Sequence, residues 1–116
     1  MEQTVGETTV VELRGDVDIL TAPSLASRLD ALTAGPCPDL VLDLSSATFI
    51  DCTGLGVLCR ARNRAEARQG RFRLVTGSAG FRRILRAVGL AEVFELYSDL
   101  GTALAPAMRA AAPAAG

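Results

Sequence analysis

The stretch Phe49–Val57, FIDCTGLGV, decides the fold, because an apolar run ends there and a helix-forming segment begins. We expect a strand to end near Ile50 and a helix to start near Gly54. The polar Asp-Cys-Thr sequence between them then lies at a helix N-terminus. There the side chain of Asp51 or Thr53 accepts a hydrogen bond from a free backbone N–H. In open α/β sheets, strand ends of this kind are where binding sites form.

The two glycines of this stretch, Gly54 and Gly56, leave little side-chain bulk at the start of the helix. One interpretation is structural, a capped helix that packs closely on the sheet. The other is functional, a backbone that a partner's surface approaches closely. The GLG motif lacks the further glycine of a dinucleotide-binding loop, and the chain contains no GxxxxGK[ST] motif. A phosphate-binding loop is therefore not indicated.

Outward from this stretch, strand-like and helix-like segments alternate along the chain. Val- and Thr-rich segments around Gly6 predict a hairpin, and Thr21 is a candidate N-cap for the first helix. The expected strands are 3–5, 8–15, 39–50, 72–77 and 91–96, and the expected helices are 22–34, 54–69, 78–88 and 98–108.

This order predicts an α/β fold with a mixed sheet. An initial antiparallel hairpin is followed by mostly parallel strands, with about four helices. We expect a single domain over residues 1–110 and a disordered Ala/Pro tail over residues 111–116.

Length and composition exclude several classes of protein. At 116 residues and 49% hydrophobic content, the chain forms one ordinary globular domain. No apolar run approaches the ~20 residues of a membrane helix, and the N-terminus lacks the pattern of a signal peptide. We therefore expect a cytoplasmic protein without membrane attachment. With no Trp and one Tyr, nucleic-acid binding is not indicated.

Charge is divided unevenly along the chain. Residues 1–59 carry nine acidic and two basic side chains, whereas residues 60–116 carry four acidic and ten basic side chains. Such an asymmetry orients a partner during encounter. The alternative is that arginines simply solvate one helix and its neighbours.

The cysteines, Cys37, Cys52 and Cys59, form no CxxC pair and are odd in number, which argues against disulfides and a zinc site. The absence of His removes the commonest general base and metal ligand. We expect no metal, no cofactor and no enzymatic activity. A helix N-terminus lowers a thiol pKa, so Cys52 is a candidate redox residue. We expect instead that Cys52 is a small buried cysteine beside the cap, and that Cys37 and Cys59 are packing residues.

Three segments together resemble the STAS domain of bacterial anti-sigma factor antagonists, over about residues 5 to 104. They are LRGDVDILTAPSL, the strand and turn VLDLSSATFIDCTGLG with its Arg-rich helix, and FRLVTGSAGFRRILRAVGLAEVFELYSD. The resemblance implies a STAS-like mixed sheet and a transcription regulator that works by partner switching. Such a protein binds an anti-sigma factor of the serine/threonine kinase type and releases a sigma factor.

The resemblance also implies a phosphorylation switch in the turn before the second helix. The kinase phosphorylates a serine directly after the Asp, the product no longer binds, and a serine phosphatase resets the cycle. Here that position is Cys52, which has no hydroxyl, and Thr53 follows it. Either Thr53 is a poorer acceptor, or the switch is lost, or Cys52 responds to oxidation instead. We expect impaired or rerouted phosphorylation.

The partner-binding surface implied by the resemblance comprises Asp16, Asp18, Asp51, Cys52, Thr53, Gly54, Leu55, Gly56 and Arg60. It requires that the Leu55-Gly56 helix start be exposed. For Asp16 and Asp18, the alternative is a solvated turn. For Arg60 and its neighbours Arg62 and Arg64, the alternative is a solvated helix face.

Two other classes of function remain open from the sequence. One is a thiol-based redox sensor that uses Cys52. The other is a nucleotide-binding or scaffold module of the STAS type. We expect a monomer or weak dimer.

Overall fold

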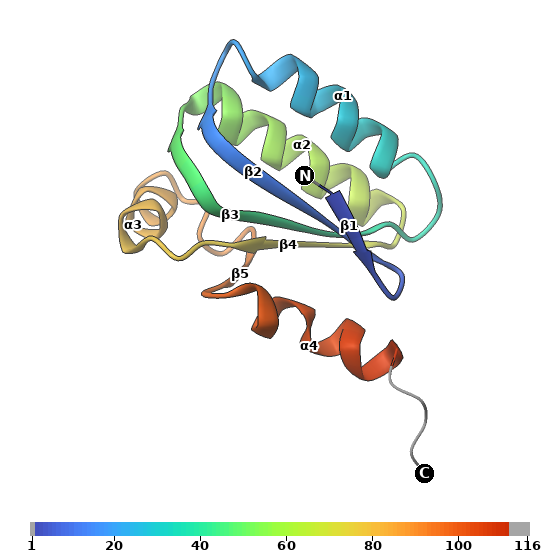
Figure 1. Ribbon diagram of the computed structural model, residues 1–116. Helices are drawn as coiled ribbons and strands as arrows, with labels where there is room; N and C mark the ends of the chain where they lie inside the picture. Colours follow the sequence, from blue (N-terminus) through green and yellow to red (C-terminus); the bar gives the residue numbers. More distant parts are fainter. Residues whose placement is uncertain (1, 112–116) are drawn as a thin grey trace.

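The computed structural model describes residues 2–111. They form one five-stranded sheet with the strand order β1-β2-β3-β4-β5, and four helices (Figure 1). The strands are β1 (Glu2–Val5), β2 (Thr8–Val17), β3 (Asp39–Ile50), β4 (Arg71–Val75) and β5 (Glu95–Tyr97), and the helices are α1 (Ala22–Leu32), α2 (Cys52–Ala67), α3 (Ala79–Ala87) and α4 (Leu100–Ala111).

The sheet is mixed, as the sequence predicts. β1 pairs with β2 in antiparallel orientation, and the pairs β2–β3, β3–β4 and β4–β5 are parallel. Figure 1 shows α1 and α2 on one face of the sheet, α4 on the opposite face, and α3 near the carboxyl end of β4. Coverage on both faces explains why the first half of β3 is a nearly continuous apolar run.

The core has one part on each face of the sheet. On the α2 face, Leu42 of β3 and Leu74 of β4 pack with Leu58 of α2, and each of these side chains is 0% exposed. On the α4 face, Val41 and Val75 pack against the helix. Alternate residues of each strand thus face opposite layers, which fixes the register of the sheet.

A buried charge joins α4 to the sheet. Arg73 of β4 is 1% exposed, and its guanidinium donates hydrogen bonds to the Asp39 carboxylate and to the backbone oxygen of Ala103. The second oxygen of Asp39 accepts from the Thr8 hydroxyl at 2.7 Å. Because a buried guanidinium without partners is strongly destabilising, this network specifies where α4 lies on the sheet.

A second ion-pair cluster joins α1 to α2. The Arg60 guanidinium binds both carboxylate oxygens of Asp30 at 3.0 Å, and Arg64 donates to the Thr33 hydroxyl and the Asp30 backbone oxygen. The Arg60 hydrogen bond holds the pKa of the Asp30 carboxyl below its usual value. Because the folded-state pKa is the lower one, this pair stabilises the fold at neutral pH. That contribution is lost as the pH falls through the folded-state pKa.

Several element boundaries differ from the sequence prediction. β2 runs on to Val17, so Asp16 lies in a strand and not in a turn, and α2 begins at Cys52. The last strand is only Glu95–Tyr97, because the residues before it form a turn that directs Phe94 into the core. No helix within residues 2–111 has the length and apolarity to cross a bilayer. Ala111 ends α4, and the rest of the expected tail, 112–116, lies outside the described residues.

Gly70, at the turn between α2 and β4, should be intolerant of any side chain. A Cβ atom there would lie 2.0 Å from the backbone oxygen of Pro38. We expect Gly70→Ala to lower the free energy of unfolding by about 2 kcal/mol or more, measured by urea denaturation. Gly35→Ala is the matched control, because a Cβ atom at Gly35 meets nothing within 4 Å. Equal stability of the two variants would contradict this packing.

Candidate functional site

The site lies where β2 and β3 end side by side. Val17 and Ile50 are paired in the sheet, and the backbone N–H of Asp51 donates to the Val17 oxygen at 3.2 Å. The β2–α1 loop and the N-terminus of α2 therefore emerge next to each other at one edge of the sheet (Figure 1). This is the position at which sites form in parallel sheets.

Asp51 caps α2. Its Oδ1 accepts from the backbone N–H of Gly54 at 2.9 Å, and its backbone oxygen accepts from the N–H of Leu55 at 2.9 Å. Of the two cap residues that the sequence allowed, the structure selects Asp51. The cap fixes the orientation of the residues that follow and places a carboxylate at the positive end of the helix dipole.

The two glycines of the turn have different roles. Gly54 is buried, and a Cβ atom there would lie 2.6 Å from the Val17 oxygen and 2.7 Å from Ile50 Cγ1. A Cβ atom at Gly56 would meet nothing within 4 Å. Gly54 therefore lets α2 approach the strand ends, whereas Gly56 is exposed. The structural interpretation is confirmed for Gly54, whereas the functional one stays a prediction for the exposed Gly56.

Leu55 corrects one expectation. The sequence-based hypothesis required an exposed Leu55, but its side chain is 8% exposed and belongs to the core beneath α2. The reason is helical geometry: Leu55 and Leu58 are three residues apart, so they share the buried face of α2. Only Gly56 of the Leu55-Gly56 pair is on the surface.

The thiol and the hydroxyl of the turn are both exposed. Cys52 and Thr53 are the first residues of α2, and they point away from the core. The expectation of a buried Cys52 is therefore wrong, because the packing contacts are made by Gly54 and Leu55. Cys37 is exposed too, which corrects its expected packing role, whereas Cys59 is half-buried against the core.

The acidic GDVD segment shapes the neighbouring loop. Asp16 lies in β2 and accepts from the Thr48 hydroxyl at 2.8 Å, which ties β2 to β3. Asp18 Oδ1 accepts from the backbone N–H groups of Leu20 and Thr21, at 3.0 and 3.2 Å. Thr21 begins α1 without a side-chain cap bond of its own. The loop is thus ordered by its own hydrogen bonds.

Ordering this loop exposes two large apolar side chains that the sequence analysis missed. Ile19 is 69% exposed and Leu20 is 85% exposed. The signal was present in the sequence, as an Ile-Leu pair between a turn-forming Asp and the start of a helix. Large apolar residues held outward by an ordered loop are typical of a contact surface.

Arg60 lies at the margin of the site. Its ion pair with Asp30 shows a role in joining α1 to α2, and Arg62 pairs with Glu66 within the same helix. Charge at the turn itself is negative, since Asp16, Asp18 and Asp51 surround the exposed residues. Within residues 2–111, no group of His, Cys, Asp and Glu side chains could hold a metal ion.

The chain belongs to the STAS domain family, which matches residues 1–103. It is 30% identical to the anti-sigma-F factor antagonist RsfB of Mycobacterium tuberculosis, over 82% of this chain and 77% of RsfB. It is 29% identical to the anti-sigma-B factor antagonist of Listeria monocytogenes, over 75% of this chain and 76% of that protein.

The crystal structure of an anti-sigma factor antagonist from Mycobacterium paratuberculosis has the same fold. It superposes with a TM-score of 0.82 at 31% identity, over 92% of this chain and 91% of that chain. Family membership and fold, both expected from the sequence, are thereby confirmed.

The different packing of the two glycines gives a paired prediction. Gly54→Ala should destabilise the protein by about 1–3 kcal/mol, because α2 must move away from Val17 and Ile50. Gly56→Ala should stabilise it by about 0.5–1 kcal/mol, because alanine favours the helix. Urea denaturation of both variants measures the difference. Similar effects of the two substitutions would show that α2 does not depend on this close approach.

Proposed function

We propose that the protein is a bacterial, cytoplasmic anti-sigma factor antagonist. It binds an anti-sigma factor of the serine/threonine kinase type, which then releases its sigma factor, and so it regulates transcription without catalysis of its own. The observation that carries the proposal is the exposed Cys52-Thr53 pair at a capped helix N-terminus, beside the exposed Ile19 and Leu20. The names of the relatives support the same role.

The physical basis of binding combines apolar contact with charge. Ile19 and Leu20 offer apolar area that a partner pocket removes from water, at about 25 cal/mol per Å². Gly56 allows close approach of the partner to the backbone at the helix start. The carboxylates of Asp16, Asp18 and Asp51 favour a basic partner surface, so association should weaken as salt increases.

Phosphorylation at Thr53 would oppose the same contact. A phosphate adds about −1.5 to −2 charges at a place already occupied by the Asp51 carboxylate. The helix N-terminus offsets part of this charge within the free protein. In the complex the phosphate must also be desolvated against the partner, and a loss of ~3 kcal/mol weakens binding by roughly two orders of magnitude.

The order of Cys52 and Thr53 decides how well the switch works. Successive helix residues differ in direction by about 100°, so Thr53 does not present its hydroxyl where a serine at position 52 would. A kinase that positions residue 52 for phosphate transfer therefore finds a thiol there instead of a hydroxyl. We infer slow phosphorylation at Thr53. A serine phosphatase is then needed only to remove phosphate from the fraction of the protein that is modified at Thr53.

The test is phosphate transfer and binding in one assay. Wild type, Thr53→Ala and Cys52→Ser are incubated with candidate anti-sigma kinases and ATP, followed by intact mass and a pull-down. We expect slow single phosphorylation of wild type, none in Thr53→Ala, and efficient phosphorylation of Cys52→Ser. The phosphorylated forms should be absent from the pulled-down fraction.

Ser78→Ala is the control, because Ser78 is an exposed hydroxyl at the start of another helix, α3. Phosphate lost in Ser78→Ala and retained in Thr53→Ala would overturn the assignment of the acceptor. Failure of every version to bind any candidate kinase would overturn the proposed function itself. Ile19→Glu should abolish binding, and with it phosphorylation of the chemically intact Thr53, if the β2–α1 loop forms the contact.

A further inference from the structure

β3 extends beyond its partner β4 and leaves one edge open. β2 pairs with β3 as far as Ile50, whereas β4 pairs only with Asp39–Asp43. Residues 44–50 therefore have β2 on one side and, among residues 2–111, no strand on the other. An open strand edge presents backbone N–H and C=O groups that pair with another extended chain.

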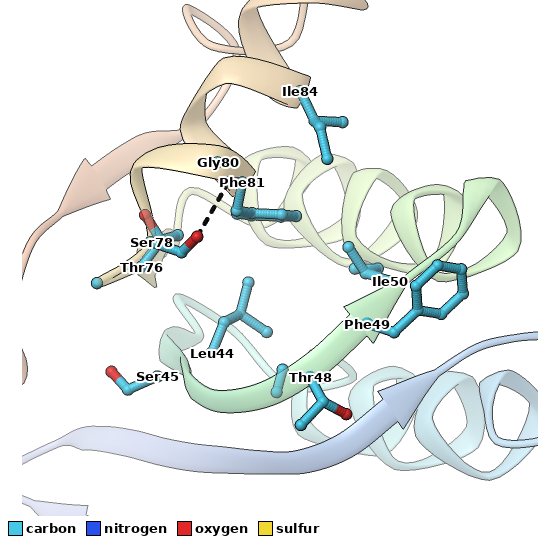
Figure 2. A pocket seen from close by; sticks show the side chains of 12 residues that line it. Leu44, Ser45, Thr48, Phe49, Ile50, Thr76, Ser78, Gly80, Phe81 and Ile84 are labelled. Carbon is cyan, nitrogen blue, oxygen red and sulfur yellow. Dashed lines mark hydrogen bonds between the residues drawn. The ribbon is translucent and has the colours of Figure 1, made fainter.

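A groove lies between this edge and α3 (Figure 2). Its volume is about 340 Å³, within the range of binding clefts. In Figure 2 the side chains of Leu44 and Ile50 from β3 face the same space as Phe81 and Ile84 from α3. The groove is thus bounded by an extended backbone on one side and an apolar helix face on the other.

Three of the four hydroxyl side chains that line the groove are engaged within the protein. The Thr76 hydroxyl accepts from Arg82 at 3.1 Å, the Ser78 hydroxyl caps α3 at Phe81, and Thr48 bonds to Asp16. The side chains therefore offer an occupant mainly apolar contact. Hydrogen bonds to an occupant come mainly from the backbone of β3, in which the Ser45 N–H already donates to Asp43 Oδ1. This favours a peptide over a small apolar molecule.

The apolar face of α3 is only partly covered. Leu85 is fully buried, but Ile84 is 48% exposed and Val88 is 54% exposed on the same side of the helix. Phe49, at the far end of the open strand edge, is 55% exposed. An occupant of the groove would remove Phe49 and Ile84, which line it, from water.

Charge around the groove is mixed and does not select the occupant. α3 carries Arg82, Arg83 and Arg86. Arg82 is bonded to Thr76 and Ser98, and at about 100° per residue Arg86 lies on the side of α3 opposite Ile84. On the β3 side, Asp16 accepts from the Thr48 hydroxyl and Asp51 follows Ile50. The kind of occupant is therefore indicated by the open backbone edge and the apolar lining.

We propose that the groove between β3 and α3 binds an extended peptide segment of a partner protein that carries apolar side chains at alternate positions. The peptide adds a strand along residues 44–50 and places one apolar side chain between Leu44 and Ile84. Strand addition of this kind takes affinity from the backbone and specificity from pockets for alternate side chains. The proposal goes beyond the function of the α2 turn and stands or falls separately from it.

The test begins with a displayed library of random peptides about ten residues long, selected on the wild-type protein and counter-selected on Ile84→Glu. We expect enriched peptides in which apolar residues alternate with polar ones. An enriched peptide is then synthesised in three forms, one unmodified and two N-methylated, each of the two at one alternate set of backbone nitrogens. The form whose methylated nitrogens would otherwise donate hydrogen bonds to β3 should bind at least about tenfold more weakly than the unmodified peptide.

Amide hydrogen exchange locates the bound peptide. Saturation with the unmodified peptide should slow exchange at N–H groups within residues 44–50 and leave the turn 52–56 unchanged. Ile84→Glu should weaken binding by about tenfold or more, whereas the matched control Ile19→Glu, an exposed isoleucine outside the groove, should bind like wild type.

Three results would overturn the proposal. They are no enrichment of alternating peptides, equal binding of both N-methylated forms and the unmodified peptide, and protection outside residues 44–50. Equal binding would indicate an apolar-ligand pocket, and protection of the edge in concentrated free protein would indicate a second copy of this chain. Folding of Ile84→Glu is verified by its urea transition, so that lost binding reports on the groove.

Discussion

The close approach of α2 to the ends of β2 and β3 is the contact on which the site depends. With no side chain at Gly54, the helix lies against the Val17 oxygen and the Ile50 side chain. The Asp51 cap and the Asp51–Val17 backbone hydrogen bond then hold strand end, turn and helix in one arrangement. Cys52 and Thr53 are exposed because their neighbours Gly54 and Leu55 make the packing contacts. A rigid turn of this kind loses little conformational entropy when a partner binds.

Electrostatics in the folded protein differs from the charge distribution along the chain. Acidic residues of the first half pair with arginines of the second half, as in Asp30 with Arg60 and Asp39 with Arg73. These pairs join elements from the two halves of the chain. Other charges gather locally, with the carboxylates of Asp16, Asp18 and Asp51 near the α2 turn and three arginines on α3. Long-range attraction of a partner should therefore come from the α2 turn or from α3, and not from a charge difference between the two halves of the chain.

The fold was largely predictable because its signals are local and repeated. The apolar run of β3, the helical spacing in α1 and the caps at Asp51 and Ser78 each marked an element correctly. The last strand was predicted too long, because the hydrophobic pattern of AEVFEL does not distinguish a strand from a turn that buries Phe94. The exposure of individual residues was harder, since it depends on tertiary packing. Leu55 and Cys52 were both assigned to the wrong environment for that reason.

The position of the site in the fold was predictable, but not all of the residues that form it. The Asp-Cys-Thr turn followed from the strand-to-helix transition and from family resemblance. Ile19 and Leu20 were missed because a short apolar pair has no periodicity, and only the hydrogen bonds of Asp18 show that the loop holds it outward. The open edge of β3 could not be predicted, since it results from the unequal lengths of β3 and β4. Relative strand length is a property of the assembled sheet.

Amide hydrogen exchange of the protein, alone and in complex with the proposed anti-sigma kinase partner, tests the central claim most directly. If the α2 turn and the β2–α1 loop form the contact surface, exchange should slow in residues 52–56 and 18–21 when the kinase binds. The α4 face of the sheet should be unchanged. Protection confined to α4, with the turn exchanging as in the free protein, would contradict the account.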